Sequence, residues 1–458
     1  MNRIKRNLCV IISSLLIFTG CSGNVSTPPL QNAGDNIPIP PESFVALSLE
    51  AQSPILHNTV AMTGSGYHVM AIQTDGGAWF WGGQYEENHL GDTAEHLNTP
   101  VKVMEGATAV SVESTHQSIL LEDGTLWNWG ENNRGEIGDG TFESRHAPVQ
   151  VLEYVQTMKT GGGNCVALLE DGSLYYWGSY TYISVISALT PNGTPENIVP
   201  HPEPVLEQVT HFEVWGGTML AIREDNSLWG WSLNDHGQLG LGHKYEVPVG
   251  KAIKLKENVQ NMWPGSDTVY VLDQDGTLWG AGRNNYGMLG RESDFNYDVA
   301  HFTPMLKNVV DFEMGDFHCT ALTADGRMWT WGDNRQGQLG IGKETMDETD
   351  TPVCVMDQVI KVYAHSDYTA AIRQDGSLWV WGESFDNLIE RDFATPDLPT
   401  KIAEDVHSAY IGLGVIIFLK DDGTLWGIGD NDTGQLADGT FENRSQPVLI
   451  MENVRLPE

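Results

Sequence analysis

The chain has 458 residues, of which 61 are Asp or Glu and 25 are Lys or Arg, so its formal net charge at pH 7 is −36. Such a chain does not offer the clustered Lys and Arg side chains that phosphate contacts need, and we therefore exclude a nucleic-acid partner. The charge fits a soluble acidic protein, or one with basic or cationic partners.

The first twenty residues are typical of an export signal. Arg3, Lys5 and Arg6 precede an apolar run from Leu8 to Phe18, which is too short to span a bilayer comfortably. We expect residues 1–20 to be removed as a signal peptide. Because this segment holds three basic residues and no acidic one, the mature chain would carry a formal charge of −39.

Cys21 follows Thr19 and Gly20, an arrangement that resembles the signal of bacterial lipoproteins, although Phe18 stands where Leu is usual. The resemblance implies that Cys21 is acylated and becomes the new N-terminus. Residues 21–45 are rich in Ser, Pro, Asn and Gly, so we expect a flexible linker between the lipid and a folded body. Membrane contact would then run through the acyl anchor alone, at the cell membrane or the outer membrane. The alternative is an ordinary signal peptide and a secreted protein.

Residues 46–458 repeat one phrase, an Asp-Gly turn followed by Trp or a substitute and then Gly, as in D-G-S-L-W-V-W-G. Successive copies are 47 to 54 residues apart, and they begin at Asp75, Asp123, Asp171, Asp225, Asp275, Asp325, Asp375 and Asp422. A period near fifty residues is typical of a propeller or a solenoid.

One copy, residues 309–342, predicts the elements of the unit. Val309–Met314 alternates as a strand, and His318–Leu322 predicts a second strand. Asp325-Gly326 suits a tight hairpin turn into a third strand, Arg327–Trp331. A fourth strand should begin after Pro352, because Pro is tolerated at a sheet edge. Four antiparallel strands make one blade, so we predict an all-β protein, a β-propeller.

The aromatic residues of the phrase are expected to pack between blades. Of the 15 Trp residues, all but Trp215 and Trp263 lie in the phrase. These two end the first strand of units four and five. Ligand stacking is one reading for them, and packing between blades is the favoured one.

Several elements recur in register over residues 58–450: G-x-x-H-x-x-A-L, D-G-x-L-W-x-W-G, N-x-x-G-Q-L-G and T-P-V-x-V. Together they resemble the repeat of the regulator of chromosome condensation family. The resemblance implies a propeller, usually of seven blades. The count of units predicts eight, and seven would leave one unit outside the ring or merged.

The His and Cys residues of the repeat favour packing. His68, His116 and His318 share one slot, but other units place Asn, Thr, Tyr or Val there, so a metal site is disfavoured. Cys165 and Cys319 share another slot in separate units and should not meet in a disulfide. With Cys354, we expect them to be buried free thiols.

No cofactor, metal or enzymatic activity is predicted. The stretch Asp430 to Gly434 mimics the opening of a calcium loop but continues as the repeated loop, which leaves calcium as the lesser alternative. Common motifs of hydrolases, metalloproteases and nucleotide-binding proteins are absent from the sequence. The alternative of a hydrolase or lyase would need carboxylates clustered at one mouth of the central channel.

Two units replace the loop that closes the phrase. Unit three carries Tyr180, Tyr182 and Ile183 in its place, and unit seven carries Phe385. Deviations in a repeat array often form binding surfaces, although neutral drift gives the same pattern. Because aromatic anchors dominate interface energetics, we predict these four residues as contact residues.

The sequence therefore predicts a monomeric, exported, lipid-anchored propeller that binds a protein or a ligand of the cell envelope. Two alternatives stand beside it. The family resemblance implies guanine-nucleotide exchange on a small GTPase, which export to a compartment without GTP disfavours. The other alternative is inhibition of an extracytoplasmic enzyme. Fold alone does not decide among them.

Overall fold

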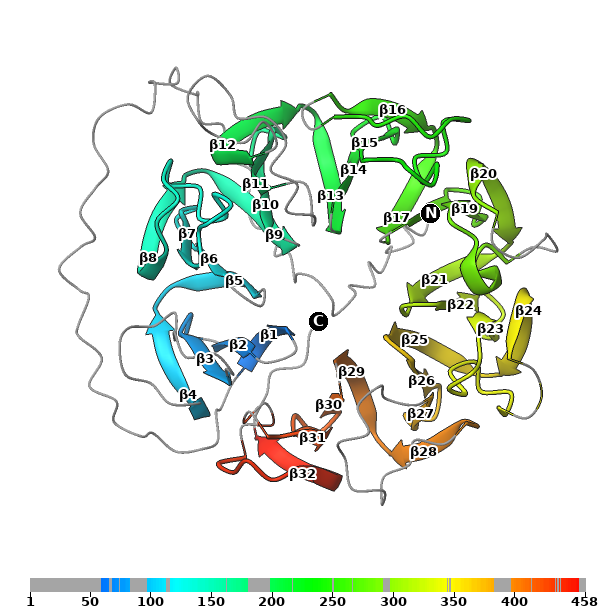
Figure 1. The fold of residues 1–458 in the computed structure, drawn as a ribbon. Coiled ribbons are helices and arrows are strands. Elements are labelled where there is room, and N and C mark those ends of the chain that lie inside the picture. The colour runs from blue at the N-terminus through cyan, green and yellow to red at the C-terminus, as the bar shows by residue number, and fades with distance from the viewer. Residues whose placement is uncertain are drawn as a thin grey trace, which may run out of the picture.

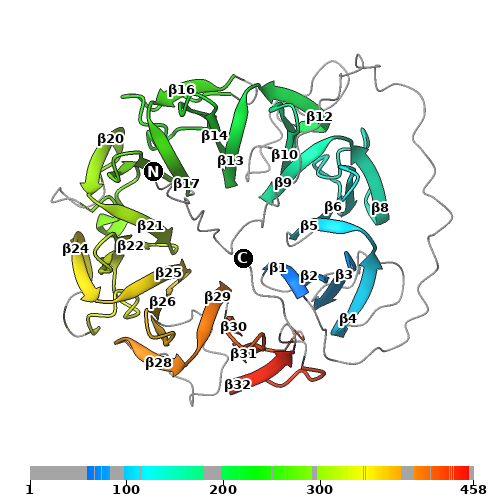
Figure 2. The same ribbon diagram turned by 180° about the vertical axis from the view of Figure 1, so that it is seen from behind.

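The computed structural model describes residues 59–452, except 66–67, 74, 83–96, 113–115, 162, 180–197, 216, 249–250, 266, 291–296, 344, 346, 383–396, 413, 433, 435 and 437. These residues form eight four-stranded antiparallel sheets around one axis, with the first strand of each sheet innermost (Figure 1; Figure 2). Each sheet contains four strands that are consecutive in the chain. The prediction of eight blades is confirmed, and the alternative of seven is wrong.

Blades 1 to 4 cover the first half of the ring. Their strands are β1 (Thr59–Ser65), β2 (His68–Gln73), β3 (Ala78–Gly82) and β4 (Leu97–Met104); β5 (Ala107–Val112), β6 (His116–Leu121), β7 (Leu126–Gly130) and β8 (Arg145–Leu152); β9 (Val155–Gly161), β10 (Asn164–Leu169), β11 (Leu174–Ser179) and β12 (Ile198–Leu206); and β13 (Val209–Trp215), β14 (Thr218–Arg223), β15 (Leu228–Trp231) and β16 (Ile253–Lys256).

Blades 5 to 8 complete the ring. Their strands are β17 (Val259–Pro264), β18 (Thr268–Asp273), β19 (Leu278–Gly282) and β20 (Val299–Leu306); β21 (Val309–Met314), β22 (His318–Thr323), β23 (Met328–Asp333) and β24 (Glu348–Met356); β25 (Val359–His365), β26 (Tyr368–Arg373), β27 (Leu378–Gly382) and β28 (Thr400–Ala403); and β29 (Val406–Gly412), β30 (Val415–Lys420), β31 (Leu425–Gly429) and β32 (Arg444–Met451).

Helix is almost absent from the described residues. A short 3-10 turn, η1 (Asn285–Gly287), is the one helical element among them. No helix in the described part of the chain is long and apolar enough to cross a membrane. The fourth strand of unit six begins at Glu348, four residues before Pro352, so its predicted start was too late.

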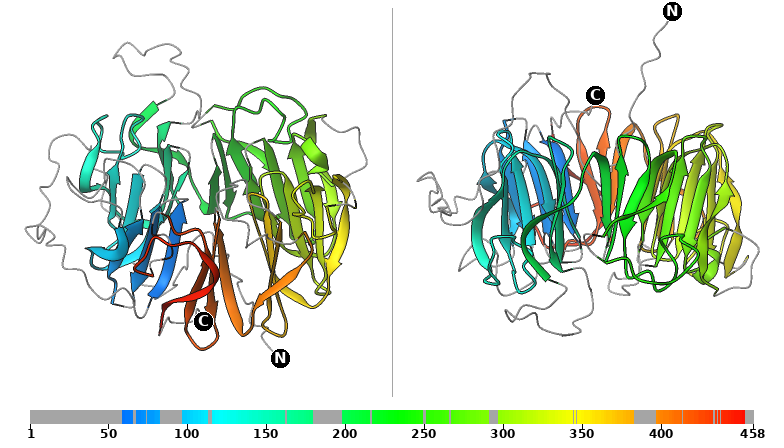
Figure 3. Two further views of the ribbon diagram at one scale, coloured as in Figure 1. Left: turned by 60° about the horizontal axis from the view of Figure 1, so that its bottom comes forward. Right: turned by 90° about the horizontal axis from the view of Figure 1, so that it is seen from above.

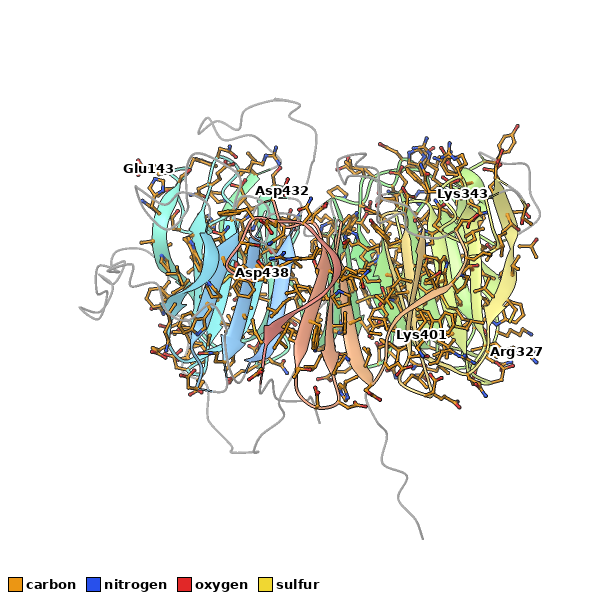
Figure 4. The ribbon with its side chains drawn as sticks, turned by 90° about the horizontal axis from the view of Figure 1, so that it is seen from below. Glu143, Arg327, Lys343, Lys401, Asp432 and Asp438 are labelled. Carbon is orange, nitrogen blue, oxygen red and sulfur yellow. The ribbon has the colours of Figure 1, made fainter. Side chains whose placement is uncertain are left out.

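The strands run along the axis, so the ring has two faces (Figure 3). We call one the loop face, because it carries the connections from first to second strand and from third to fourth strand. The other is the hairpin face, which carries the Asp-Gly turns and the turns between blades. Figure 4 shows Glu143 and Lys343 at the loop face and Arg327 at the hairpin face.

The Asp-Gly turns close the hairpins through their own side chains and backbone. Asp375 Oδ1 accepts a hydrogen bond from the Ser377 amide at 3.0 Å, a bond that favours the turn over continued strand. The next residue has a positive φ, +76° at Gly376. Asn226 takes this position in blade 4 with φ +60°, a conformation that Asn tolerates better than most residues.

In blades 3, 6 and 7 the second Trp of the phrase joins the blade to the one before it. Trp331 and Trp381 are fully buried. The Trp381 Nε1–H donates to the Gln338 carbonyl of the preceding blade at 3.1 Å, and Trp331 bonds the Met288 carbonyl in the same way at 2.8 Å. A Cβ on Gly340 would lie 2.7 Å from Trp381 Nε1, which explains the Gly that ends the repeated loop.

The turns between blades add a second, backbone connection. The Val359 amide donates to the Gly326 carbonyl at 2.9 Å, and the Gln374 amide donates to the Gln358 carbonyl at 2.8 Å. The turn that contains Gln358 thus bonds the hairpin turns of both blades that it joins. Equivalent bonds recur between the other consecutive blades on the hairpin face.

Blades 1 and 8 close the ring by side-chain packing. Trp79 and Trp81 of blade 1 lie in one buried cluster with Val415, Ile417 and Leu425 of blade 8. Among the described strands, none is shared between the first sheet and the last. Apolar burial between these two blades therefore holds the ends of the array together.

Candidate functional site

The repeated loops on the loop face are built around one buried Asn. The Asn334 Oδ1 accepts the Leu339 amide at 3.2 Å, and its Nδ2 donates to the Gly342 carbonyl at 3.1 Å. The corresponding residues of the other loops are also fully buried: Asn132, Asn234, Asn284 and Asn431. These polar side chains are used to fold the loops, which leaves them unsuited to binding a ligand.

The stretch that mimics a calcium loop follows the same plan. Asn431 Oδ1 accepts the Leu436 amide at 2.8 Å, as its counterparts do. Within the described residues, no group of three or more His, Cys, Asp or Glu side chains is arranged to hold a metal ion. The geometry therefore supports the reading of residues 430–434 as a repeated loop.

A Glu replaces the repeated Gln in the loop of blade 2. Gln338 Oε1 accepts the Gln336 amide at 2.9 Å, and Glu136 Oε2 accepts the Arg134 amide at 2.7 Å in the equivalent place. Glu136 is 2% exposed. Burial raises its pKa to about 7, because the hydrogen bonds from backbone amides only partly offset the loss of solvent.

The shared His slot is a packing position in the two blades where it can be seen. His116 and His318 are fully buried, and the His318 Nε2 lies 2.8 Å from the Thr369 hydroxyl of the next blade. Burial lowers the pKa of His318 to about 4, so the ring is neutral at pH 7. The side chain of His68 is outside the described ones.

The shared Cys slot also lies between blades. Cys165 and Cys319 are buried thiols, and neither forms a disulfide. Cys165 Sγ lies 3.4 Å from His116 Nε2 and 3.3 Å from the Glu136 carbonyl, but burial closes this thiol–imidazole pair to substrate. Burial raises the pKa of the Cys319 thiol to about 12.

Cys354 differs from the expectation of a buried thiol. It is free and exposed. The residue lies on β24, the outermost strand of blade 6, which has no neighbouring strand on its outer side. The prediction of burial was wrong for this Cys because the sequence pattern does not mark the outer edge of a blade.

The residues predicted to carry function lie outside the described residues. This applies to the lipidation site Cys21 and to the contact residues Tyr180, Tyr182, Ile183 and Phe385. They stay predictions.

The two Trp residues outside the phrase have different environments. Trp263 is half-buried and packs edge-on against Phe312 of the next blade, with ring centroids 5.1 Å apart, so its predicted packing is confirmed. Trp215 is 54% exposed, so it is not enclosed between blades as the favoured reading expected. The reason is register, since Trp215 is the last residue of β13 whereas Trp263 lies inside β17.

Three exposed aromatic residues lie on the loop face of two adjacent blades. We call Trp215, Tyr245 and Tyr297 the aromatic patch. Tyr245 is 77% exposed and Tyr297 is 68% exposed. Tyr245 belongs to the connection between β15 and β16, and Tyr297 to the connection between β19 and β20. The sequence offered no signal for the patch beyond aromatic residues in loops.

Ion pairs beside the aromatic patch connect the same two blades. His236 Nδ1 of blade 4 lies 3.2 Å from Asp298 Oδ1 of blade 5, and Lys244 also pairs with Asp298. Burial alone would raise the pKa of Asp298, but its bonds with Lys244 and His236 outweigh this and keep the pKa below the ordinary value. The backbone that presents the patch is thereby held across the blade boundary.

The innermost strands place a second set of charges around the axis. Lys159 of β9 pairs with Glu213 of β13 at 2.6 Å, and Lys361 of β25 pairs with Asp311 of β21 at 2.9 Å. Glu313 lies two residues after Asp311 on β21 and is half-buried. All five side chains belong to first strands, which surround the axis in Figure 1.

The two axial glutamates respond differently to their surroundings. Burial would raise the pKa of Glu213, but Lys159 and His211 outweigh it, so the pKa falls below the ordinary value. Burial raises the pKa of Glu313 to about 8, and Asp311 and Glu213 add to this while Lys361 opposes it. Glu313 is therefore mostly neutral at pH 7 unless another cation approaches.

Comparison with known proteins agrees with the architecture. Residues 123–168, 275–322 and 325–372 match the model of the regulator of chromosome condensation (RCC1) repeat, and residues 309–338 match a second model of that repeat. A search of curated protein sequences finds no match.

Two solved structures share the fold. Prp20p from Saccharomyces cerevisiae is 19% identical, with 68% of this chain and 82% of that chain covered and a TM-score of 0.52. Human WBSCR16 is 17% identical, with 71% and 93% covered and a TM-score of 0.52. The matched repeats and the propeller that contains them lead to one conclusion: this chain carries repeats of the regulator of chromosome condensation family.

Proposed function

We propose that the protein is a non-enzymatic binding scaffold of the cell envelope, exported by residues 1–20 and anchored through acyl chains on Cys21. The observation that carries the binding role is the aromatic patch of Trp215, Tyr245 and Tyr297 on the loop face. Large exposed aromatic side chains supply most of the binding energy of protein interfaces. A rigid ring presents them at little cost in conformational entropy.

The predicted contact segments support the same face. Residues 180–197 connect β11 to β12, and residues 383–396 connect β27 to β28. Both are connections from third to fourth strand, and the described strand ends next to them lie at the loop face. Blade 3, which carries the first of them, is the neighbour of blade 4 with its Trp215. We therefore propose the loop face of blades 3 to 5 as the binding surface.

The absence of enzymatic activity is part of the proposal. The polar residues that recur from unit to unit form hydrogen bonds within the loops and turns. The pair of Cys165 and His116 is buried between blades, where a substrate does not reach it. Inhibition of an extracytoplasmic enzyme is one form that loop-face binding could take. The same patch would then contact the enzyme.

Affinity capture from envelope fractions tests the binding role. The bait is the chain without residues 1–20, compared with the double variant Trp215→Ala, Tyr245→Ala. Tyr154→Ala is the matched control, because Tyr154 is an aromatic residue 60% exposed on the hairpin face. The proposal expects a partner that the double variant loses and the control retains. Equal capture by all three baits would contradict it.

Metabolic labelling with palmitate tests the anchor. The wild-type protein should take up label and the Cys21→Ala variant should not. If the wild-type protein takes up no label, the lipid anchor is excluded, and the alternative of a secreted protein is favoured.

Nucleotide exchange is the alternative implied by family. The solved structure of Prp20p is described together with its binding to Gsp1p and histones, which is a property of that protein. Among the described residues, no feature of the loop face favours exchange activity. We expect that the protein does not accelerate nucleotide release from a panel of small GTPases. Faster release from any of them would favour nucleotide exchange over the binding scaffold.

A further inference from the structure

We propose that the loop-face boundary of blades 6 and 7 is a pH-sensitive switch, closed while the carboxyl group of Asp367 is neutral and loosened when it is ionised. The switch consists of the turn between β25 and β26, which is Ser366 and Asp367, and of the side chain of Gln338 from the repeated loop of blade 6. It is separate from the aromatic patch and does not depend on the proposed function.

The carboxyl group of Asp367 is buried and has a partner for one oxygen only. The residue is 1% exposed, and its Oδ1 accepts a hydrogen bond from Gln338 Nε2 at 3.0 Å. Among the described residues, its Oδ2 has no hydrogen-bond partner. Because a buried carboxylate oxygen without a partner is costly, these surroundings favour the neutral acid.

Two further acids lie near Asp367. Asp316 is in the connection between β21 and β22, where its amide donates to the Ser366 carbonyl at 3.0 Å. Asp333 ends β23, and Arg335 bonds its carboxylate at 2.7 and 2.9 Å. Burial raises the pKa of Asp367 to about 7, and the charges of Asp316 and Asp333 add to this. The charge of Arg335 opposes them.

Two histidines are the other titratable groups beside this turn. His318 of β22 is fully buried, with its Nε2 2.8 Å from the Thr369 hydroxyl, and His365 is the last residue of β25. Burial lowers the pKa of both imidazoles, that of His318 to about 4. Neither ring therefore supplies a positive charge at pH 7 that would stabilise an ionised Asp367.

Gln338 connects the state of Asp367 to both blades. Its Oε1 accepts the Gln336 amide at 2.9 Å, a bond within the loop of blade 6. Its carbonyl accepts the Trp381 N–H at 3.1 Å and the Thr369 hydroxyl at 2.7 Å, both from blade 7. A weaker contact between Asp367 and Gln338 therefore loosens the loop and the blade boundary together.

Blade 5 has an Asp at the same position, but with a cation beside it. Asp267 directly precedes the second strand of its blade, as Asp367 does. Its side chain is 37% exposed and pairs with Arg283 at 3.1 Å. Arg283 directly follows the Gly that ends the third strand, and the sequence has Glu383 at that position in blade 7. Asp267 is therefore the matched control for Asp367.

The direction of the switch follows from the pKa. Asp367 keeps its proton up to about pH 7 in the closed boundary, whereas a solvent-exposed Asp has the ordinary pKa of 3.8. Opening therefore releases a proton, and each pH unit between 4 and 7 should favour opening by about tenfold. Above pH 7 the carboxyl group is ionised in both states, so the effect reaches a plateau.

Amide hydrogen exchange of the chain without residues 1–20 tests the switch at pH 5, 6, 7 and 8. Protection is read from peptides by mass spectrometry and corrected for the intrinsic pH dependence of exchange. Residues 335–342 and 366–369 should lose protection by up to about a hundredfold between pH 5 and pH 8, most of it below pH 7. Residues 267–270 of blade 5, which include the control Asp267, should show no such loss.

Variants assign the effect to one carboxyl group. Asp367→Asn keeps the shape and cannot ionise, so its protection should not fall with pH, whereas Asp267→Asn should behave as wild type does. Asp316→Asn changes an exposed residue and removes a neighbouring charge, so the plateau should begin at a lower pH. Wild-type protection that is constant with pH, or an equal fall in Asp367→Asn, overturns the proposal. If Asp367→Asn does not fold, an unchanged pH dependence in Asp316→Asn overturns it.

Discussion

The Glu136→Gln substitution should stabilise the protein at neutral pH. Glu136 occupies a slot that Gln fills in blades 4 and 6, where Gln238 Oε1 and Gln338 Oε1 accept backbone amides at 3.2 and 2.9 Å. The Glu side chain accepts the corresponding amide at 2.7 Å. Gln can therefore accept the same backbone amide, and the change removes the need to keep a carboxyl group neutral.

The magnitude follows from the pKa. Burial raises the pKa of Glu136 from 4.5 to about 7, so the folded state binds a proton more tightly than the unfolded state. The stability contributed by the neutral acid is complete below pH 4.5 and is lost as the pH rises through 7. The full loss corresponds to about 3 kcal/mol of unfolding free energy. Glu136→Gln should recover up to this amount at pH 8 and little at pH 4.5.

Urea unfolding followed by Trp fluorescence at pH 5 and pH 8 measures the difference. Glu313 and Asp367, whose pKa values burial also raises, to about 8 and about 7, remain in the variant. The wild-type decline with pH should thus become shallower without disappearing. Glu143→Gln in the same loop is the matched control, because Glu143 is exposed. Equal pH dependence in Glu136→Gln and wild type would refute the assignment of Glu136 as a buried neutral acid.

Three further predictions concern the architecture. Trp381→Phe removes the N–H donated to the Gln338 carbonyl, and should cost about 1–3 kcal/mol in urea unfolding; the half-buried Trp379→Phe should cost less, and the reverse order would contradict the role of the second Trp. Asn334→Ala removes the side-chain bonds to Leu339 and Gly342, and should speed amide hydrogen exchange in residues 335–342; unchanged exchange would show that the loop does not depend on its Asn. In the native protein a thiol reagent should modify Cys354 and spare Cys165 and Cys319, as peptide mass spectrometry can show; modification of all three at one rate would contradict their burial.

The repeat made the fold predictable from the sequence. Eight copies of one phrase at a nearly constant period require eight equivalent units, and each unit contains enough strand signals for a complete blade. The count was therefore a better guide than the usual seven blades of the family. The second Trp of the phrase packs against the final Gly of the loop in the preceding blade. Gly340, which lacks a side chain, leaves room for Trp381.

The candidate sites were harder to predict. Which side chains of a first strand face the axis depends on a register shift, between Val209 and His211 in blade 4, that alternation of residues does not reveal. Exposed Trp215 and packed Trp263 differ in their place along the first strand, since Trp215 is the last residue of β13 and Trp263 lies inside β17. Glu136 did leave a signal in the sequence, because it departs from the Gln of the repeat. The sequence does not show that its carbonyl accepts hydrogen bonds from Trp177 and Cys165 of the next blade.

The central claim is that the repeat provides the framework and that the loop face of blades 3 to 5 binds the partner. β11 ends at Ser179, which is buried, and β12 begins at Ile198, so a Gly-Ser linker in place of residues 180–197 spares both strands. The most direct measurement is the dissociation constant of the captured partner for this replacement, for Trp215→Ala and for Tyr154→Ala. The account predicts weaker binding by the first two and wild-type affinity for Tyr154→Ala. Wild-type affinity in the first two, or a loss confined to Tyr154→Ala, would contradict it.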